Sequence, residues 1–138
     1  MCLNRLLTEK QKTKILDKIT RKGITVYKVI KVINSKFYPS YQDNETAFEE
    51  GTNIDVNKTN KYLHLWEGPG EQRIYKSGYH SYKTKKAAEK LLRHLKNNCI
   101  DYRLIHCKIH KSWILEIGFD HGITFVTSKI IFPKKEKD

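Results

Sequence analysis

The chain has 138 residues, 38% of them hydrophobic, and its 27 basic and 15 acidic residues give a formal net charge of +12. This length fits one domain with a buried core, so we expect 1–138 to form a single domain. No apolar run approaches the roughly 20 residues that span a bilayer, and three cysteines do not suit a disulfide framework. These features exclude a membrane-spanning or disulfide-stapled protein and predict a soluble, cytoplasmic protein.

Charge is distributed unevenly along the chain. Residues 1–36 carry a net charge of +8, residues 37–72 carry −5, and residues 73–138 carry +9. Two basic segments around an acidic one predict a directed positive surface, for which nucleic acid and other polyanions are natural partners. Alternatively, the positive charge reflects a lysine-rich composition and not a polyanionic partner.

The N-terminal segment 8–22 has the pattern of an amphipathic helix. Thr8 and Gln11 form a capping box, and Gly23 suits the position after the helix end. Apolar side chains fall on one side of this helix and basic side chains on the other. The basic residues that fall within one arc opposite the apolar side are Lys10, Lys14, Lys18 and Arg21.

A pair of strands is predicted next. Segment 24–33 is apolar at both parities, which favours a central strand. Asn34 and Ser35 form a tight turn, and 36–41 returns as an edge strand because it contains a proline.

The middle of the chain changes character. Residues 42–60 are polar and acidic with little periodicity, and they predict a mobile acidic excursion. Strands are then expected at 61–66 and 73–82, joined by a turn that contains two glycines and a proline.

A second amphipathic helix is predicted over 85–96, with Thr84 as its N-cap. Its alanines and leucines occupy one arc, and its basic residues occupy the complementary arc with only Glu89 among them. Three strands are expected after it, at 102–110, 113–118 and 123–132. Residues 133–138 form a frayed basic tail.

These elements predict an α+β fold. We expect a mostly antiparallel sheet of roughly five to seven strands, with the N-terminal helix and one amphipathic helix packed on the sheet. Phosphate-binding glycine loops, zinc-protease motifs and serine-nucleophile motifs do not occur in the sequence. We therefore expect a protein without a cofactor that is not an enzyme.

Basic residues in and beside the two helices predict a nucleic-acid-binding surface. Lysines on a helix face can follow a phosphate backbone, and each contact releases counterions. Tyr75, Tyr79 and Tyr82 suit base stacking, and packing of these tyrosines over a sheet is the alternative. The candidate nucleic-acid-binding residues are Lys10, Lys14, Lys18, Arg21, Arg73, Lys76, Lys83, Lys85, Lys86, Lys90 and Arg93.

Cysteine and histidine offer other chemistry. On a strand, His106 and His110 share one face, whereas Cys107 points to the other. The sequence has no second pair of cysteine or histidine residues at the spacing of a zinc site, so we expect no metal. Cys2 becomes an N-terminal nucleophile if Met1 is removed, with its own amine as the base. An N-terminal-cysteine enzyme is therefore one alternative function.

Several short motifs are shared with a known group of proteins. They are Met1-Cys2, Val26-Tyr27-Lys28-Val29, Gly78-Tyr79-His80-Ser81-Tyr82 followed by Ala87-Ala88, and Ser128-Lys129-Ile130. In these motifs the chain resembles a family of small proteins from tailed phages and giant viruses. The resemblance implies a viral or mobile-element accessory protein that binds nucleic acid or a nucleic-acid-containing host defence complex. The most specific version of this function is a counter-defence inhibitor of the anti-CRISPR type. A second possibility is that the acidic segment 42–60 docks on a basic surface of a host protein.

A second resemblance concerns residues 77–91, which are similar to the stretch of ADP-ribosyltransferases where a glycine-aromatic strand precedes an alanine-bearing helix. In that family a late strand carries a catalytic glutamate, whereas 124–132 of this chain has no acid. The resemblance implies a nucleotide-binding protein or sponge without transferase activity. Its ligand cleft would lie beside Tyr27, Tyr79, His80 and Tyr82.

Overall fold

The computed structural model of the protein describes residues 3–40, 47–54, 62–64, 74–76, 78–95 and 99–134. Within these ranges, no helix is long and apolar enough to cross a membrane. A 3-10 turn at Lys111–Trp113 joins the strand Asp101–Ile109 to the strand Ile114–Phe119. The helices and strands are β1 (Arg5–Leu6), α1 (Glu9–Asp17), β2 (Ile24–Ile33), β3 (Lys36–Pro39), β4 (Gly51–Ile54), β5 (Tyr62–His64), β6 (Ile74–Lys76), β7 (Tyr79–Tyr82), α2 (Lys85–Leu95), β8 (Asp101–Ile109), β9 (Ile114–Phe119), β10 (Ile123–Thr127) and β11 (Lys129–Phe132).

Nine of these strands form one antiparallel sheet in the order β1-β9-β10-β7-β2-β8-β11-β4, with β3 paired to the C-terminal half of β2. β5 and β6 pair separately. The predicted α+β class, the antiparallel sheet and the two helices are confirmed. The sheet has more strands than the roughly five to seven expected from the sequence. One predicted strand divides within the sheet, and the short strands β1 and β4 join its edges.

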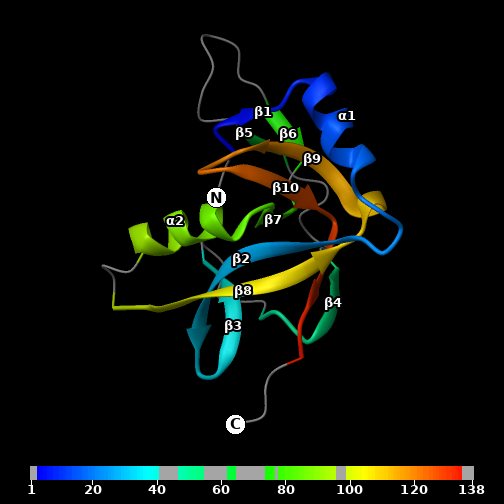
Figure 1. Ribbon diagram of the computed structural model, residues 1–138. Coiled ribbons are helices and arrows are strands. Elements are labelled where there is room, and N and C mark those ends of the chain that lie inside the picture. Colours follow the sequence, from blue (N-terminus) through cyan, green and yellow to red (C-terminus); the bar gives the residue numbers. More distant parts are fainter. Residues whose placement is uncertain are drawn as a thin grey trace.

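The strand predicted at 123–132 bends at Ser128. β10 pairs with β7 and β9, whereas β11 pairs with β8 and β4. At the bend, the N–H of Ser128 donates to the carbonyl of Trp113 at 3.0 Å. Since β2 lies between β7 and β8, the bend closes a ring of strands around the main core; Figure 1 shows β10 continuing into the red β11.

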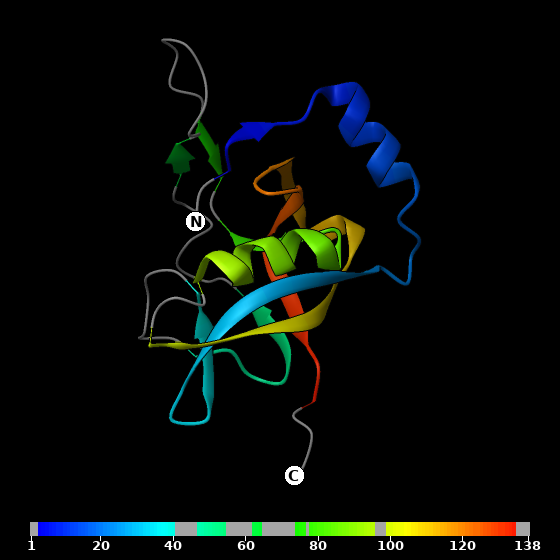
Figure 2. The ribbon, with the colours of Figure 1, turned by 60° about the vertical axis from the view of Figure 1, so that its left-hand side comes forward.

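The two faces of β2 determine where α2 lies. Val26 and Ile30 are fully buried in the main core, while Val29, of opposite parity, packs beneath α2. The helix begins after Thr84, whose hydroxyl accepts the N–H of Ala87 at 3.2 Å as an N-cap does. Its buried residues are Ala87, Ala88 and Leu91. Figure 2 shows α2 lying along β2 and β8, which it contacts together with β7.

α1 starts where the sequence predicts and ends earlier. The N–H of Gln11 donates to Thr8 Oγ1 at 3.2 Å, and the N–H of Thr8 donates to Gln11 Oε1 at 3.0 Å, which confirms the capping box. The helix ends at Asp17 rather than at residue 22, because Ile19 turns into the core and is only 7% exposed. Arg21 therefore lies beyond the helix.

The strand predicted at 73–82 is interrupted at Gly78, which belongs to neither β6 nor β7. β6 pairs with β5, as expected for that hairpin, but β7 joins β10 and β2 in the main sheet. In one continuous strand, Tyr75 and His80 would point to opposite faces. Because the strand is interrupted, the hydroxyl of Tyr75 instead lies 2.9 Å from His80 Nε2.

Part of the acidic segment 42–60 belongs to the fold rather than to a mobile excursion. Phe48 bridges to Phe37 in β3 and stacks on Phe132, with ring centroids 4.3 Å apart. β4 then pairs with β11. The rest of that segment, at 42–46 and 55–60, lies outside the described residues, as do residues 135–138 of the predicted tail.

Candidate nucleic-acid interface

α2 presents a row of exposed basic side chains opposite its buried face. The apolar residues occupy one arc of the helix, so the basic residues of the other arc point away from the sheet. Within the part of the chain that the structure describes, no carboxylate forms an ion pair with these cations. They are available to bind anions. The exposed residues are Lys83, Lys85, Lys86, Lys90 and Arg93.

A groove of about 530 Å³ lies between α2 and the strands β2 and β8. Strand register explains its composition, because Tyr27 of β2 is paired with His106 of β8. Side chains directly opposed in an antiparallel ladder point to the same face, so both rings face the groove. The lining residues are Thr25, Tyr27, Lys85, Glu89, Leu92, Leu104 and His106.

The groove combines three kinds of side chain. Leu92 and Leu104 supply an apolar surface, and Lys85 and Glu89, one helical turn apart, form a charged wall. Just outside the lining, the exposed Lys108 lies opposite Thr25 on the same face of the sheet. An aromatic and apolar interior with cations at its margin suits a planar ring that carries a phosphate.

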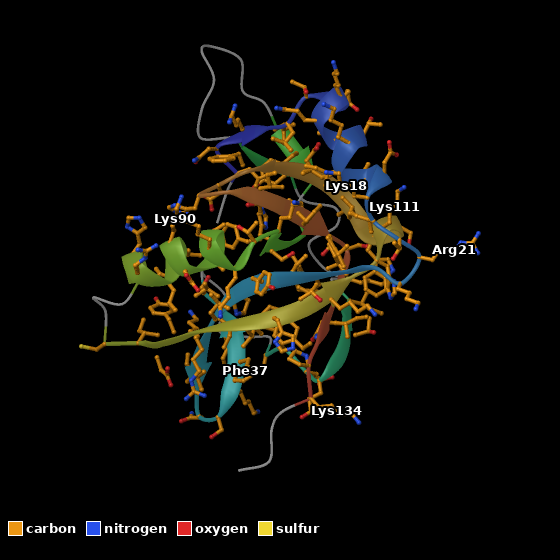
Figure 3. All side chains as sticks on the ribbon, viewed as in Figure 1. Lys18, Arg21, Phe37, Lys90, Lys111 and Lys134 are labelled. Carbon is orange, nitrogen blue, oxygen red and sulfur yellow. The ribbon has the colours of Figure 1, made fainter. Side chains whose placement is uncertain are left out.

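The basic residues predicted in the N-terminal segment form a separate surface. Lys10, Lys14, Lys18 and Arg21 are all exposed. Figure 3 shows Lys18 and Arg21 on the right side of the view and Lys90 on the left. The structure therefore does not join the two predicted basic groups into one patch around the groove.

Lys12, also on α1, has a structural contact instead. It forms an ion pair with Glu116 of β9, and its Nζ lies 3.5 Å from Glu9 Oε1. Glu116 Oε1 also accepts the N–H of Ile117 at 3.0 Å. Glu116 thus holds α1 against the sheet.

The predicted cleft residues are not brought together. Tyr27 lines the groove, but Tyr79 points into the main core, with its ring 5.8 Å from that of Phe48. Tyr82 is 1% exposed beneath α2. A cleft containing all four predicted residues does not form in the described structure, because successive residues of β7 point to opposite faces.

His80 is nearly buried, and its ring is held by the protein itself. Nε2 lies 2.9 Å from the Tyr75 hydroxyl, and Nδ1 lies 3.1 Å from the carbonyl oxygen of Gly78. A carbonyl only accepts, so Nδ1 donates to it, and in the neutral ring Nε2 then accepts the tyrosine proton. The Tyr75 oxygen in turn accepts the N–H of Leu3 at 2.9 Å. This chain of hydrogen bonds fastens the N-terminal segment to β6 and β7.

Sequence reasoning missed Lys28, whose side chain is buried on the core-facing parity of β2. Its Nζ donates to the carbonyl of His80 at 2.7 Å and lies 5.6 Å from the centre of the Phe48 ring. Burial raises the pKa of the nearby Cys107 thiol to about 12, and the charge of Lys28 acts in the opposite direction. The sequence did contain a signal for this burial. Lys28 lies between Val26 and Ile30, at the alternate positions of the strand whose other side chains are apolar and face the core.

Several predicted residues cannot be placed. Cys2 and Arg73 lie outside the described residues, and the side chain of Lys76 is not described. Among described residues, no cluster of three metal-ligating side chains occurs. His106 is exposed and Cys107 buried, in agreement with the predicted opposite faces.

Comparison of the chain with protein-family models, curated proteins and solved structures finds no match.

Proposed function

We propose that the protein binds nucleic acid, with the exposed basic face of α2 and the adjoining groove as the contact surface. The observation that carries this proposal is the row of cations along α2, unpaired with any described carboxylate, beside a groove lined by Tyr27 and His106. Phosphate contacts supply affinity, and aromatic rings supply stacking surfaces for bases.

Salt dependence provides the first test. If about four lysine or arginine side chains contact phosphates, affinity falls roughly a hundredfold between about 50 and 200 mM salt. Fluorescence anisotropy with labelled RNA and DNA oligonucleotides measures this slope. Affinity that does not change with salt would exclude phosphate contacts as the basis of binding.

Charge reversal locates the surface. The triple variant Lys86→Glu, Lys90→Glu, Arg93→Glu is expected to lose at least about tenfold in affinity at moderate salt. The matched variant Lys10→Glu, Lys14→Glu, Lys18→Glu changes net charge equally on the separate α1 surface, and we expect a much smaller loss. Equal losses in both variants would mean that overall charge, rather than α2, governs binding.

The proposed cellular setting is counter-defence, in which the protein occupies a nucleic-acid-containing host complex such as a CRISPR effector. This setting draws on the resemblance of the short sequence motifs to those of phage and giant-virus proteins. A pull-down from host lysate, with and without nuclease, tests it. Capture of one defence complex that requires the α2 cations supports the setting, and failure to retain any such complex contradicts it.

A further inference from the structure

We propose that the groove beside α2 holds an unpaired nucleobase, so that the ligand is single-stranded nucleic acid and the protein discriminates among bases. The inference rests on the nucleic-acid binding proposed above and deepens it. It specifies the kind of strand, the position of one base and the residue that reads its edge.

The shape of the groove is the first argument. Its volume of about 530 Å³ falls within the range of about 300–1,000 Å³ typical of small-ligand sites. A duplex presents phosphates and base edges to a protein, whereas the flat faces of its bases are covered by their neighbours. A groove with ring and leucine walls therefore suits a base that has left the stack.

The ring pair is the second argument. Tyr27 and His106 come from adjacent strands and are paired in register, so their rings present a common surface on one face of the sheet. Leu92 of α2 and Leu104 of β8 add apolar contact on the same groove. Stacking on such surfaces tolerates any base, because every base has a π face.

The charge distribution orients the nucleotide. Lys85 lies in the wall of the groove. Two further exposed lysines flank it: Lys83 just before the N-terminus of α2, and Lys108 on β8 opposite Thr25. Glu89 is a carboxylate within the lining and repels a phosphate there. The base therefore enters the groove, while its phosphates stay at the margin with the lysines.

Glu89 also gives the site a preference among bases. A carboxylate accepts hydrogen bonds and cannot donate them. At ring position 4, cytosine carries an amino donor and uracil a carbonyl acceptor, and the two rings have nearly the same shape. With Glu89 facing position 4 of the bound base, we expect cytosine to be favoured over uracil.

The test uses the full chain and short labelled oligonucleotides of cytidine and of uridine, as RNA and as DNA, with a mixed-sequence single strand and its duplex. We expect the single strand to bind at least about tenfold tighter than its duplex, and oligocytidine about fivefold or more tighter than oligouridine. Preference for either sugar is compatible with the site, because the ring and Glu89 contacts concern the base.

Tyr27 variants separate stacking from packing. Tyr27→Phe keeps the ring and should bind normally, whereas Tyr27→Leu keeps apolar bulk and should lose about fivefold to a hundredfold in single-strand affinity. Circular dichroism and thermal melting establish that each variant is folded. If Tyr27→Leu does not fold, His106→Ala takes its place, because His106 is exposed and its loss should also weaken single-strand binding.

Glu89→Gln tests the base preference. Glutamine offers a donor as well as an acceptor, so the cytidine preference should shrink while uridine binding is retained or improved. Three results would overturn the inference and leave nucleic-acid binding standing. They are equal binding of duplex and single strand, wild-type affinity in both Tyr27→Leu and His106→Ala, and no cytidine preference in the wild type. No binding to any oligonucleotide would overturn the proposed function itself.

Discussion

The hydroxyl of Tyr82 donates a hydrogen bond to Asp120 Oδ2 at 3.0 Å, although the two residues are 38 positions apart in the chain. Tyr82 is 1% and Asp120 8% exposed, so the bond is buried beneath α2. It connects β7 to the turn between β9 and β10. Tyr82 was predicted from the sequence to line a ligand cleft. Its buried hydrogen bond instead gives it a role in stability.

We expect Tyr82→Phe to lower the free energy of unfolding by about 1.5–3 kcal/mol, because a buried carboxylate loses its donor. Asp120→Asn keeps a carbonyl oxygen as acceptor and should cost less. Urea denaturation measures both variants. A Tyr82→Phe protein as stable as the wild type, with impaired nucleic-acid binding, would instead assign the hydroxyl to a ligand.

Leu91 and Lys90 are neighbours on α2 with opposite environments. Leu91 is 1% exposed, whereas Lys90 is exposed. Leu91→Ala should cost about 2–5 kcal/mol, because it removes buried methyl groups and leaves a cavity. Lys90→Ala should change stability by no more than about 0.5 kcal/mol. Comparable stability losses in the two variants, measured by thermal and urea unfolding, would show that the helix is rotated from the described orientation.

Gly23 and Gly51 form a matched pair with φ of +80° and +83°. An alanine Cβ at Gly51 meets nothing within 4 Å, so Gly51→Ala should cost only the left-handed strain of about 1–2 kcal/mol. At Gly23 a Cβ would lie 2.2 Å from the carbonyl oxygen of Ile109. Gly23→Ala should therefore cost about 1–3 kcal/mol more than Gly51→Ala. Equal losses of unfolding free energy would contradict the close approach of the chain to β8.

Cys107 and Cys99 should differ in reactivity toward alkylating reagents. Burial raises the pKa of the Cys107 thiol from 9.0 to about 12, so little reactive thiolate forms in the folded protein, whereas Cys99 is exposed. Peptide mass spectrometry after iodoacetamide treatment should find Cys99 modified and Cys107 protected, and denaturant should abolish the difference. Rapid native labelling of Cys107 would contradict its burial.

The same thiol makes stability depend on pH. The unfolded chain releases the thiol proton near pH 9.0, below the folded value of about 12. The folded state therefore binds more protons across this window, and the contribution of Cys107 to stability is present below pH 9.0 and is lost as pH rises toward 12. Cys107→Ala should reduce this alkaline loss in urea denaturation series. An unchanged pH profile in the variant would assign the loss to other groups.

Local elements could be predicted from the sequence because they depend on residues a few positions apart. The capping box of Thr8 and Gln11 and the N-cap at Thr84 form as expected. Asn34 and Ser35 adopt φ of 51° and 65°, which suits the tight hairpin turn between β2 and β3. The opposite faces of α2 likewise follow from helical periodicity alone.

The candidate site depended on tertiary structure. The basic residues of α2 were visible in the sequence, but the groove exists because β2 pairs with β8 in the register that puts Tyr27 opposite His106. A shift of one residue would turn both side chains to the other face, and core packing between distant segments selects the register. The bend at Ser128, which divides one predicted strand between two different pairs of neighbouring strands, has the same origin. Sequence therefore determined the elements and their polar faces, whereas long-range packing decided which faces meet, because burial of apolar surface between distant segments outweighs local preference.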